Sequence, residues 1–229
     1  MLPVLLRLGT SVGSALGRGV GRSLLRGALR SGGGGGGGGA VRITATSNFD
    51  EVAKMIGDLS EDVARKAAAR AATRTVEQGR TKMSRDIRAD FNLPASTVKD
   101  SLQVNKASAS KGLSGIEASL EALTRRGRSM NVIRFGARQT KKGVTVQIRK
   151  GGGRKVVRNA FIANDGRTVF QRVGKKRFPI RAVQTVGVSQ MFNTRRINDG
   201  VVRMIEEKYP EIFEREAKFY LSKFNKHRA

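Results

Sequence analysis

An apolar stripe between residues 61 and 90 constrains the fold of this chain more than any other feature. Apolar side chains recur there every three or four residues, which places them on one face of an α-helix. Glu61 and Asp62 stand at its start, where the helix dipole favours acids. Leu93-Pro94 ends it, because proline disfavours helical geometry in the preceding residue. The pattern predicts a long helix over about 61–90, whose alanines let another element pack closely; its apolar face is Val63, Ala67, Ala71, Val76, Met83, Ile87 and Phe91.

Further helices are predicted on both sides of this one. Asn48 followed by Glu51 indicates a helix start, because the amide caps the first turn and the carboxylate reinforces it. Pro94 suits the first position of a short helix that runs through Leu102. Near the C-terminus, two apolar faces predict helices, and Pro210 is expected to break or kink the run between them. The two faces are Val201, Val202, Met204 and Ile205, and then Ile212, Phe213, Ala217, Tyr220, Leu221 and Phe224.

Strands are predicted where apolar and polar residues alternate or where β-branched residues gather. Residues 143–149 alternate most regularly, which indicates a half-buried strand. The remaining segments are a strand at 41–45, a loop or irregular strand at 104–113, a strand at 116–120, a basic turn at 125–128 and a strand at 132–135.

Residues 153–192 predict a β-hairpin that returns into a helix. Val156, Val157, Phe161 and Ile162 form the first apolar run. The turn is expected at 164–166, because Asp-Gly tolerates the positive φ angles of tight hairpins. The returning strand spans 168–173 and is followed by a basic turn and an extended Phe-Pro segment.

Together these elements predict an α+β fold. A long N-terminal helix and C-terminal helices would pack on a small, mostly antiparallel β-sheet, with a flexible basic arm in front. Eight consecutive glycines, residues 32–39, have no side chains to pack and predict a flexible linker. The domain boundaries are therefore an arm at 1–31, the linker at 32–39 and a folded domain at 40–229.

The arm is rich in arginine and contains no acid. Its leucines and valines recur at helical spacing, but scattered glycines weaken an isolated helix. Three interpretations remain for the arm: a segment that becomes ordered when it binds a partner surface, an unstructured tail, or an organelle transit peptide. The apolar stretch is too short and too often interrupted to span a bilayer, which needs about 20 apolar residues. The main prediction includes no membrane partner.

The charge of the chain is strongly unbalanced, at +27 from 45 basic and 18 acidic residues. A field of this sign favours polyanions, and nucleic acid first among them. Between Arg125 and Arg181 there are eighteen Lys or Arg and one acid, whereas the C-terminal helices hold five glutamates. The separation fits an acidic face meeting a basic one between subunits, or solvated helix surface. The candidates for facing DNA or a subunit are Arg18, Arg22, Arg26, Arg30, Arg149, Lys150, Arg154, Lys155, Arg158, Arg172, Lys175, Lys176 and Arg177.

Motifs for enzymatic chemistry are missing from the sequence. There is no cysteine, and the one histidine is His227. Neither glycine-rich run has the order of a phosphate-binding P-loop, and no paired carboxylates suit a metal-dependent nuclease. We predict no catalytic residue, no metal site, no cofactor and no enzyme. Tryptophan is absent and tyrosine occurs twice, so nucleic-acid contact would run through phosphates and ignore base sequence.

One order of motifs resembles a known family. An Ala-Phe-Ile-Ala strand, a turn, a Val-Phe-Gln-Arg strand, a Phe-Pro-Ile segment and a Val-Ser-Gln-Met-Phe run resemble the minor tail protein Z family of tailed bacteriophages, over roughly residues 41–224. The chain departs from the family pattern at 186–189, where Val-Gly-Val-Ser stands in place of Gly-Pro-Ser-Val. The fold-defining residues of this order are Phe161, Phe170, Phe178, Pro179, Met191 and Phe192.

The resemblance implies a structural virion protein that completes the head-proximal end of a long tail. It would be made in the bacterial host cytoplasm and then reside in the tail or neck of the virion. Residues 40–229 would be a tail completion domain in a homo-oligomer, expected as a ring of six. The implied partners are the tail terminator, the tail tube, the head connector and the genomic double-stranded DNA in the channel.

Two other functions fit the residues without the resemblance. One is a sequence-independent nucleic-acid-binding protein that acts outside a virion, which predicts salt-sensitive binding of random duplex. The other is a membrane-surface protein that uses residues 1–30.

Overall fold

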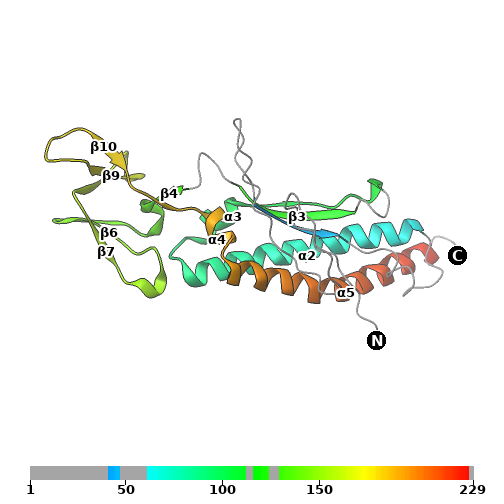
Figure 1. Cartoon of the computed structure of the whole chain (residues 1–229). Coiled ribbons are helices and arrows are strands. Elements are labelled where there is room, and N and C mark those ends of the chain that lie inside the picture. Colours follow the sequence, from blue (N-terminus) through cyan, green and yellow to red (C-terminus); the bar gives the residue numbers. More distant parts are fainter. Residues whose placement is uncertain (1–40, 47–60, 112–115, 124–128, 227–229) are drawn as a thin grey trace, which may run out of the picture.

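The computed structural model describes residues 41–46, 61–111, 116–123 and 129–226. The predicted arm and linker, the helix start at Asn48 and the basic turn at 125–128 lie outside these ranges. Figure 1 shows an elongated molecule in which two long helices and one sheet form a helical body, and short strands form a lobe beyond one end of it. We call residues 129–186 the basic β lobe.

Helix α2 (Glu61–Asp90) has the bounds that the apolar stripe predicts. Its inner surface is built from small residues such as Ala67 and Ala71, which are fully buried. In Figure 1 a sheet lies above α2, and helix α5 (Arg195–Lys226) lies below it. Gly79 marks a close approach of the two helices, since a Cβ added there would lie 3.0 Å from Ile205 Cδ1. Small side chains along α2 therefore allow the close packing that the sequence predicts.

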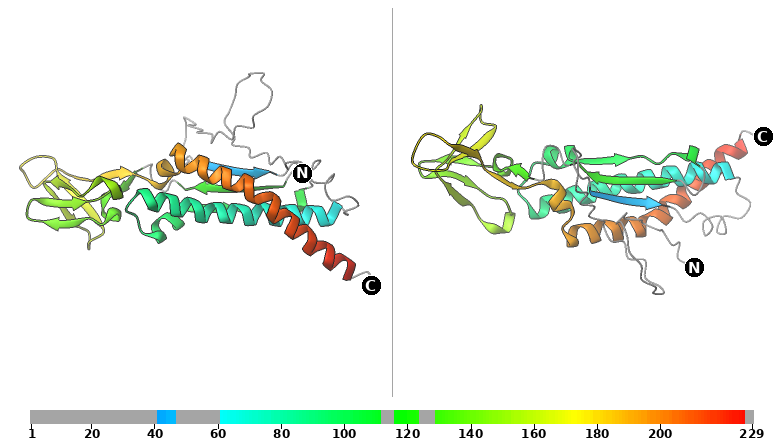
Figure 2. Two further views of the ribbon diagram at one scale, coloured as in Figure 1. Left: turned by 90° about the horizontal axis from the view of Figure 1, so that it is seen from below. Right: turned by 45° about the horizontal axis from the view of Figure 1, so that its top comes forward.

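Helix α5 is a single helix of 32 residues with Pro210 inside it. Of the two effects expected at Pro210, a break or a kink, the break does not occur. Buried side chains flank the proline on both sides, namely Ile205, Tyr209, Ile212 and Phe213. Their packing offsets the missing backbone hydrogen bond, which would otherwise cost about 3 kcal/mol or more. The C-terminal turns of α5 diverge from α2, as the left view of Figure 2 shows.

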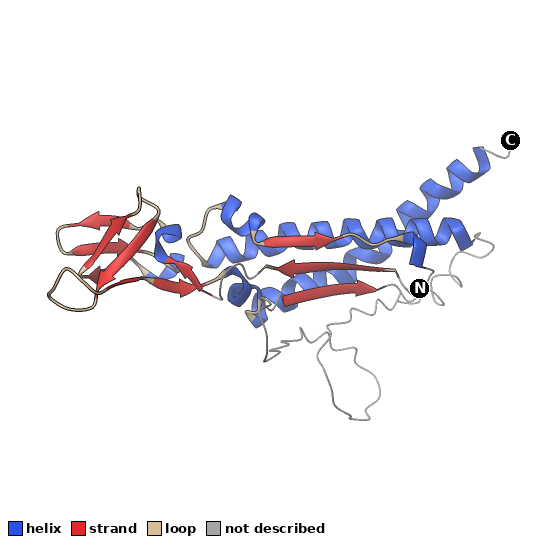
Figure 3. Ribbon diagram, turned by 90° about the horizontal axis from the view of Figure 1, so that it is seen from above, coloured by secondary structure: helices blue, strands red, loops and turns tan. Residues whose placement is uncertain are grey.

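The sheet of the helical body has the strand order β1-β3-β2 and is antiparallel. Figure 3 shows it lying along the two long helices. Helix α3 ends before Leu102, because Leu102 pairs with Ala122 in the sheet, so the predicted short helix is two residues too long. The elements are β1 (Val41–Thr46), α3 (Ala95–Asp100), β2 (Leu102–Asn105), the 3-10 turn η1 (Ala109–Lys111) and β3 (Glu117–Ala122).

The basic β lobe contains two three-stranded antiparallel sheets and one strand pair. The first sheet is β5 (Arg138–Thr140), β6 (Gly143–Val146) and β7 (Lys155–Arg158). The second is β8 (Ala160–Ala163), β9 (Thr168–Arg172) and β10 (Ile180–Ala182). The pair is β4 (Ser129–Asn131) with β11 (Gln184–Val186), and the 3-10 turns are η2 (Val132–Phe135) and η3 (Lys150–Gly152).

The predicted hairpin is confirmed in part. Strands β8 and β9 pair around a turn in which Asn164, Asp165 and Gly166 have positive φ angles, as the Asp-Gly signal indicates. The residues before Asn159 do not belong to this hairpin, because Asn159 itself takes a φ of 57° and ends strand β7. Strand β7 pairs with β6 instead, so the first apolar run is divided between two sheets.

Residues 132–135 form a 3-10 turn, so the strand predicted there is wrong. The side chain of Asn131 accepts a hydrogen bond from the Ile133 N–H at 3.1 Å, which starts the turn. Gly136 ends it with a φ of 64°. The strand predicted at 143–149 ends at Val146, because the chain then turns to form a bridge from Arg149 to Phe91 of the helical body.

Helix α4 (Val188–Phe192) returns the chain from the lobe to the helical body. Its Met191 and Phe192 are buried in a core that also contains Phe135 of the lobe and Met83 of α2. The lobe and the body thus share one core, and the predicted α+β fold is confirmed.

Candidate functional site

The basic β lobe carries fifteen Lys or Arg side chains and one acid, Asp165. That acid is already paired, since its carboxylate lies 2.7 Å from Arg167 Nη2 in an exposed turn. In the part of the chain that the structure describes, this is the lobe's one ion pair. The remaining cations therefore project their field outward, toward solvent or a partner.

The helical body uses its acids differently. Glu216 of α5 is almost fully buried and pairs with Arg70 and Arg74 of α2. Asp86 pairs with Lys82, and Asp90 pairs with Arg196. Lys208 holds the pKa of Glu211 below its ordinary value through a hydrogen bond. Much of the acidic surface that the sequence offers as a face for a basic neighbour is thus paired within the chain.

The candidate cations fall in two regions of the lobe. Arg149, Lys150, Arg154 and Lys155 lie on or beside turn η3, at the junction with the helical body. Lys175, Lys176 and Arg177 lie in the loop between β9 and β10 (Figure 1). Arg158 and Arg172 lie on β7 and β9 between these regions. Arg18, Arg22, Arg26 and Arg30 lie outside the described residues.

The loop between β9 and β10 exposes apolar as well as basic side chains. Phe178 is 62% exposed and Val173 is 61% exposed. The guanidinium of Arg177 lies 5.6 Å from the centre of the Phe178 ring, and that of Arg172 lies 4.8 Å from the Phe161 ring. Aromatic and arginine side chains that stand together at a surface are typical anchors of protein interfaces.

The fold-defining residues of the family motif differ in their surroundings. Met191 and Phe192 are buried, and the half-buried rings of Phe161 and Phe170 face each other across the β8–β9 hairpin at 6.1 Å. Phe178 and Pro179 are exposed.

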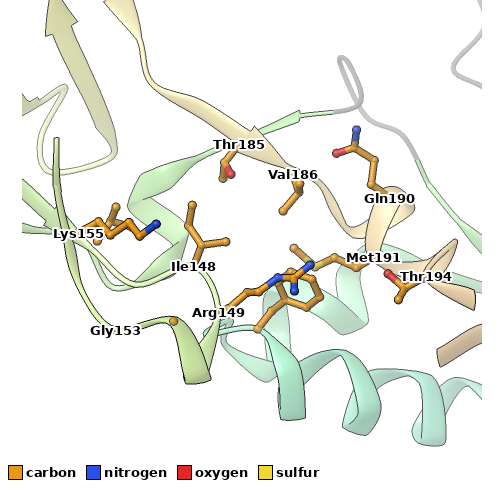
Figure 4. Close-up of a pocket in the computed structure, with 12 residues that line it drawn as sticks. Ile148, Arg149, Gly153, Lys155, Thr185, Val186, Gln190, Met191 and Thr194 are labelled. Atoms are coloured by element: carbon orange, nitrogen blue, oxygen red, sulfur yellow. The ribbon is translucent and has the colours of Figure 1, made fainter. Parts of the chain in front are cut away.

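A groove lies where the lobe meets the helical body, and we call it the junction groove. Its first hollow has a volume of about 530 Å³, and Figure 4 shows the residues around it. An adjoining hollow shares Phe91, Arg149, Gly152 and Thr194 with the first and extends to Arg196. Four separate segments build the first hollow: Phe91 just after α2, residues 146–155, strand β11 with α4, and Thr194 just before α5.

The groove has an apolar floor and a basic rim. Val146, Phe91 and Met191 are buried beneath it, and Ile148 and Val186 are half-buried. Arg149 and Lys155 are exposed at its edge. The Arg149 guanidinium lies 5.6 Å from the centre of the Phe91 ring.

Sequence reasoning found Arg149 and Lys155 as candidates but missed the groove itself. Phe91 ends the predicted stripe and Met191 belongs to the family motif, yet neither pattern indicates a shared hollow. No local signal could have found it, because its walls come together only when the lobe packs on the end of α2.

Candidate metal ligands do not gather in the described ranges. Within 41–46, 61–111, 116–123 and 129–226, no set of three or more His, Cys, Asp or Glu side chains could hold a metal ion. Among the same residues, no helix is long and apolar enough to cross a membrane.

The sequence model of one family, described as prophage minor tail protein Z, matches residues 49–227. No curated protein and no solved structure matches the chain. The matched range includes the junction groove and every strand of the basic β lobe.

Proposed function

Because the chain belongs to the prophage minor tail protein Z family, we propose that it completes the head-proximal end of a phage tail. Membership makes it a bacteriophage tail protein with a structural role. The finer proposal is that it joins the tail tube and terminator to the head connector and supports the passage of DNA. Its place in the particle is then the neck.

The observation that carries this proposal is the uneven charge of the elongated molecule. The basic β lobe stands beyond one end of a helical body whose acids are largely paired, and its cations have one carboxylate among them. A part with this distribution suits a joint between a protein tube and a channel filled with DNA. Phosphate contacts by Lys and Arg position a DNA backbone without reading its sequence.

We further propose that several copies act together as a ring of six, to match the symmetry of a tail tube. Rings arise when one surface of a subunit binds a different surface of the next and the rotation closes. The exposed Phe178 and Arg177 of the β9–β10 loop give such a surface an aromatic anchor.

A nonsense mutation in the gene tests the proposal. Induced lysogens carrying it should yield full heads and separate tails, with infectivity restored when the intact gene is supplied in trans. Electron microscopy of the lysate gives the readout. Infectious, joined particles that lack this protein would contradict the proposal.

A sequence-independent nucleic-acid-binding role outside the virion is the second candidate, and the charge of the lobe favours it equally. The two roles differ in where the protein is found. Protein gel analysis of purified particles should show a few copies per virion for the first role and none for the second.

A further inference from the structure

We propose that the junction groove binds an extended segment of a neighbouring virion protein, and that this segment combines acidic with apolar side chains. The inference deepens the proposed function and rests on it for the identity of the neighbour. Three features of the groove carry it: the floor, the rim and the strand edges beside it.

The floor selects a peptide over a nucleic-acid backbone. Phe91, Ile148 and Met191 line the hollow with apolar side chains, and Figure 4 shows Ile148 and Met191 among them. A phosphate placed on these three side chains would lose water without gaining hydrogen bonds from them, which costs free energy. Apolar side chains placed there would leave water, which gains about 25 cal/mol for each Å² of apolar surface buried.

The rim selects acidic side chains. Arg149 and Lys155 have no carboxylate partner in the described part of the chain. At the adjoining hollow Arg196 pairs with Asp90, so it is partly neutralised. A segment that carries carboxylates beside its apolar side chains would satisfy Arg149 and Lys155, and a basic segment would be repelled.

Two strand edges lie at the groove. Among the described residues, β7 pairs only with β6, and β11 pairs only with β4. Both edge strands contribute to the lining, β7 through Lys155 and β11 through Thr185 and Val186. An edge strand offers unpaired backbone groups to an extended peptide, which gains main-chain hydrogen bonds while alternate side chains fill the hollow.

The groove is held in shape before any partner arrives. The Asn92 N–H donates to the Ile148 carbonyl at 2.9 Å, and Arg149 forms a backbone bridge to Phe91. On the opposite wall, the Gln190 side chain accepts from the Gly187 N–H at 3.0 Å, which fixes the start of α4. Binding to a pre-formed groove avoids the cost of ordering it.

A steric block gives the sharpest test. Gly152 lines both hollows, and a Cβ there would meet only the Arg149 Cβ at 3.6 Å, an ordinary contact. Gly152→Phe should therefore leave the fold intact and fill the groove. Gly174→Phe is the matched control, because Gly174 is exposed in the β9–β10 loop and a Cβ there meets nothing within 4 Å.

The probes are overlapping synthetic peptides that cover the other tail and neck proteins encoded beside this gene. The purified full chain is applied to the peptides and binding is measured by fluorescence anisotropy. We expect binding by segments that alternate apolar and acidic residues. Gly152→Phe should weaken that binding by at least about tenfold, and Gly174→Phe should leave it unchanged.

Charge-reversal variants distinguish a specific contact with the rim cations from non-specific electrostatic attraction to the lobe. Arg149→Glu with Lys155→Glu should abolish binding of the same peptides. Lys141→Glu with Lys142→Glu makes the same charge change in the exposed β5–β6 turn and should reduce binding by less than about threefold.

Several results would overturn the proposal. These are the absence of any bound peptide, equal binding of basic and acidic segments, or binding that survives Gly152→Phe. If Gly152→Phe instead weakens binding of a 20-base-pair duplex as much as binding of the peptides, the groove is a nucleic-acid site and the proposal falls. Each of these results leaves the proposed role in tail completion standing, because that role is tested separately, by whether joined infectious particles form without the protein and by where the protein lies in the particle.

Discussion

Glu216 is an acid of α5 that is paired within the chain and is therefore not free to meet a basic neighbour. Its side chain is 3% exposed and lies 3.1 Å from Arg70 Nε, with Arg74 as a second partner. Arg70 also lies 5.2 Å from the centre of the Phe219 ring. One carboxylate therefore joins α2 to α5 through two arginines whose outer parts remain in water.

Replacing Glu216 with Gln should destabilise the protein by about 1–3 kcal/mol, because two charged donors lose a buried acceptor charge. The matched control is Glu214→Gln, whose exposed pair with Lys218 lies on the same helix. That control should change stability by less than about 1 kcal/mol. Urea unfolding followed by circular dichroism measures both, and equal effects would contradict the buried role of Glu216.

Glu206, unlike Glu216, lowers the stability of the folded protein at neutral pH, and its contribution to stability depends on pH. Burial raises the pKa of Glu206 above its ordinary value, and the nearby Arg203 offsets this only in part. A carboxyl with a raised pKa in the folded state binds protons more readily there than in the unfolded chain. Its contribution to stability is therefore largest below the unfolded pKa of about 4.3 and is lost as pH rises through the folded pKa.

Glu206→Gln should consequently stabilise the protein at pH 7 relative to the wild type, and the two proteins should converge near pH 3.5. Comparing the two proteins at each pH removes the effects of all other titrating groups. The free energy of unfolding at the two pH values gives the readout. A stability difference that is the same at both values would contradict the assignment.

Among the contacts between elements, the packing of α5 on α2 depends on the small residue Gly79. Gly79 allows it, because any larger residue would press on Ile205 Cδ1. Gly79→Val should destabilise the protein by about 1–3 kcal/mol through overpacking. The cost should be smaller in an Ile205→Val background, which lacks the Cδ1 atom, and a double-mutant cycle in urea measures the coupling. Additive effects would show that the two residues do not meet.

Elements with a long periodic pattern were predictable from the sequence, and those set by distant contacts were not. The bounds of α2 follow from its stripe and its flanking signals, and the turn of the β8–β9 hairpin follows from Asp-Gly. The division of the first apolar run between β7 and β8 depends on the φ of Asn159, which no pattern indicates. The break predicted at Pro210 does not occur, because the packing of α5 on α2 outweighs a local helix-breaking preference.

Of the candidate site, only its concentration of basic residues was predictable from the sequence. The excess of Lys and Arg between 125 and 181 identified the lobe, and Arg149 and Lys155 were among the candidates. The apolar floor could not be found in this way, because Phe91, Ile148 and Met191 are separated in sequence and meet only through the packing of lobe on body.

In the whole molecule, unpaired cations gather in the basic β lobe, whereas the acids of the helical body are largely paired with cations of the same chain. This distribution predicts that binding of DNA by the lobe depends on salt concentration. Lys175→Ala with Lys176→Ala and Arg177→Ala removes three exposed charges of the lobe. If the loop binds phosphates, the slope of log K against log salt for random duplex should fall by about 0.9 for each phosphate that the variant no longer neutralises. Lys208→Ala with Lys218→Ala is the control, since both side chains pair with glutamates of α5. Equal slopes for all three proteins would contradict DNA binding by the loop.

The position of the protein in the particle decides whether it completes the head-proximal end of the tail. Purified virions can be labelled with gold-conjugated antibodies raised against the folded chain and imaged by electron microscopy. We expect label at the junction of head and tail, in a few copies per particle, and none on the heads and tails from the nonsense mutant. Label at the distal tip, label along the whole tube or the absence of label from intact virions would contradict it.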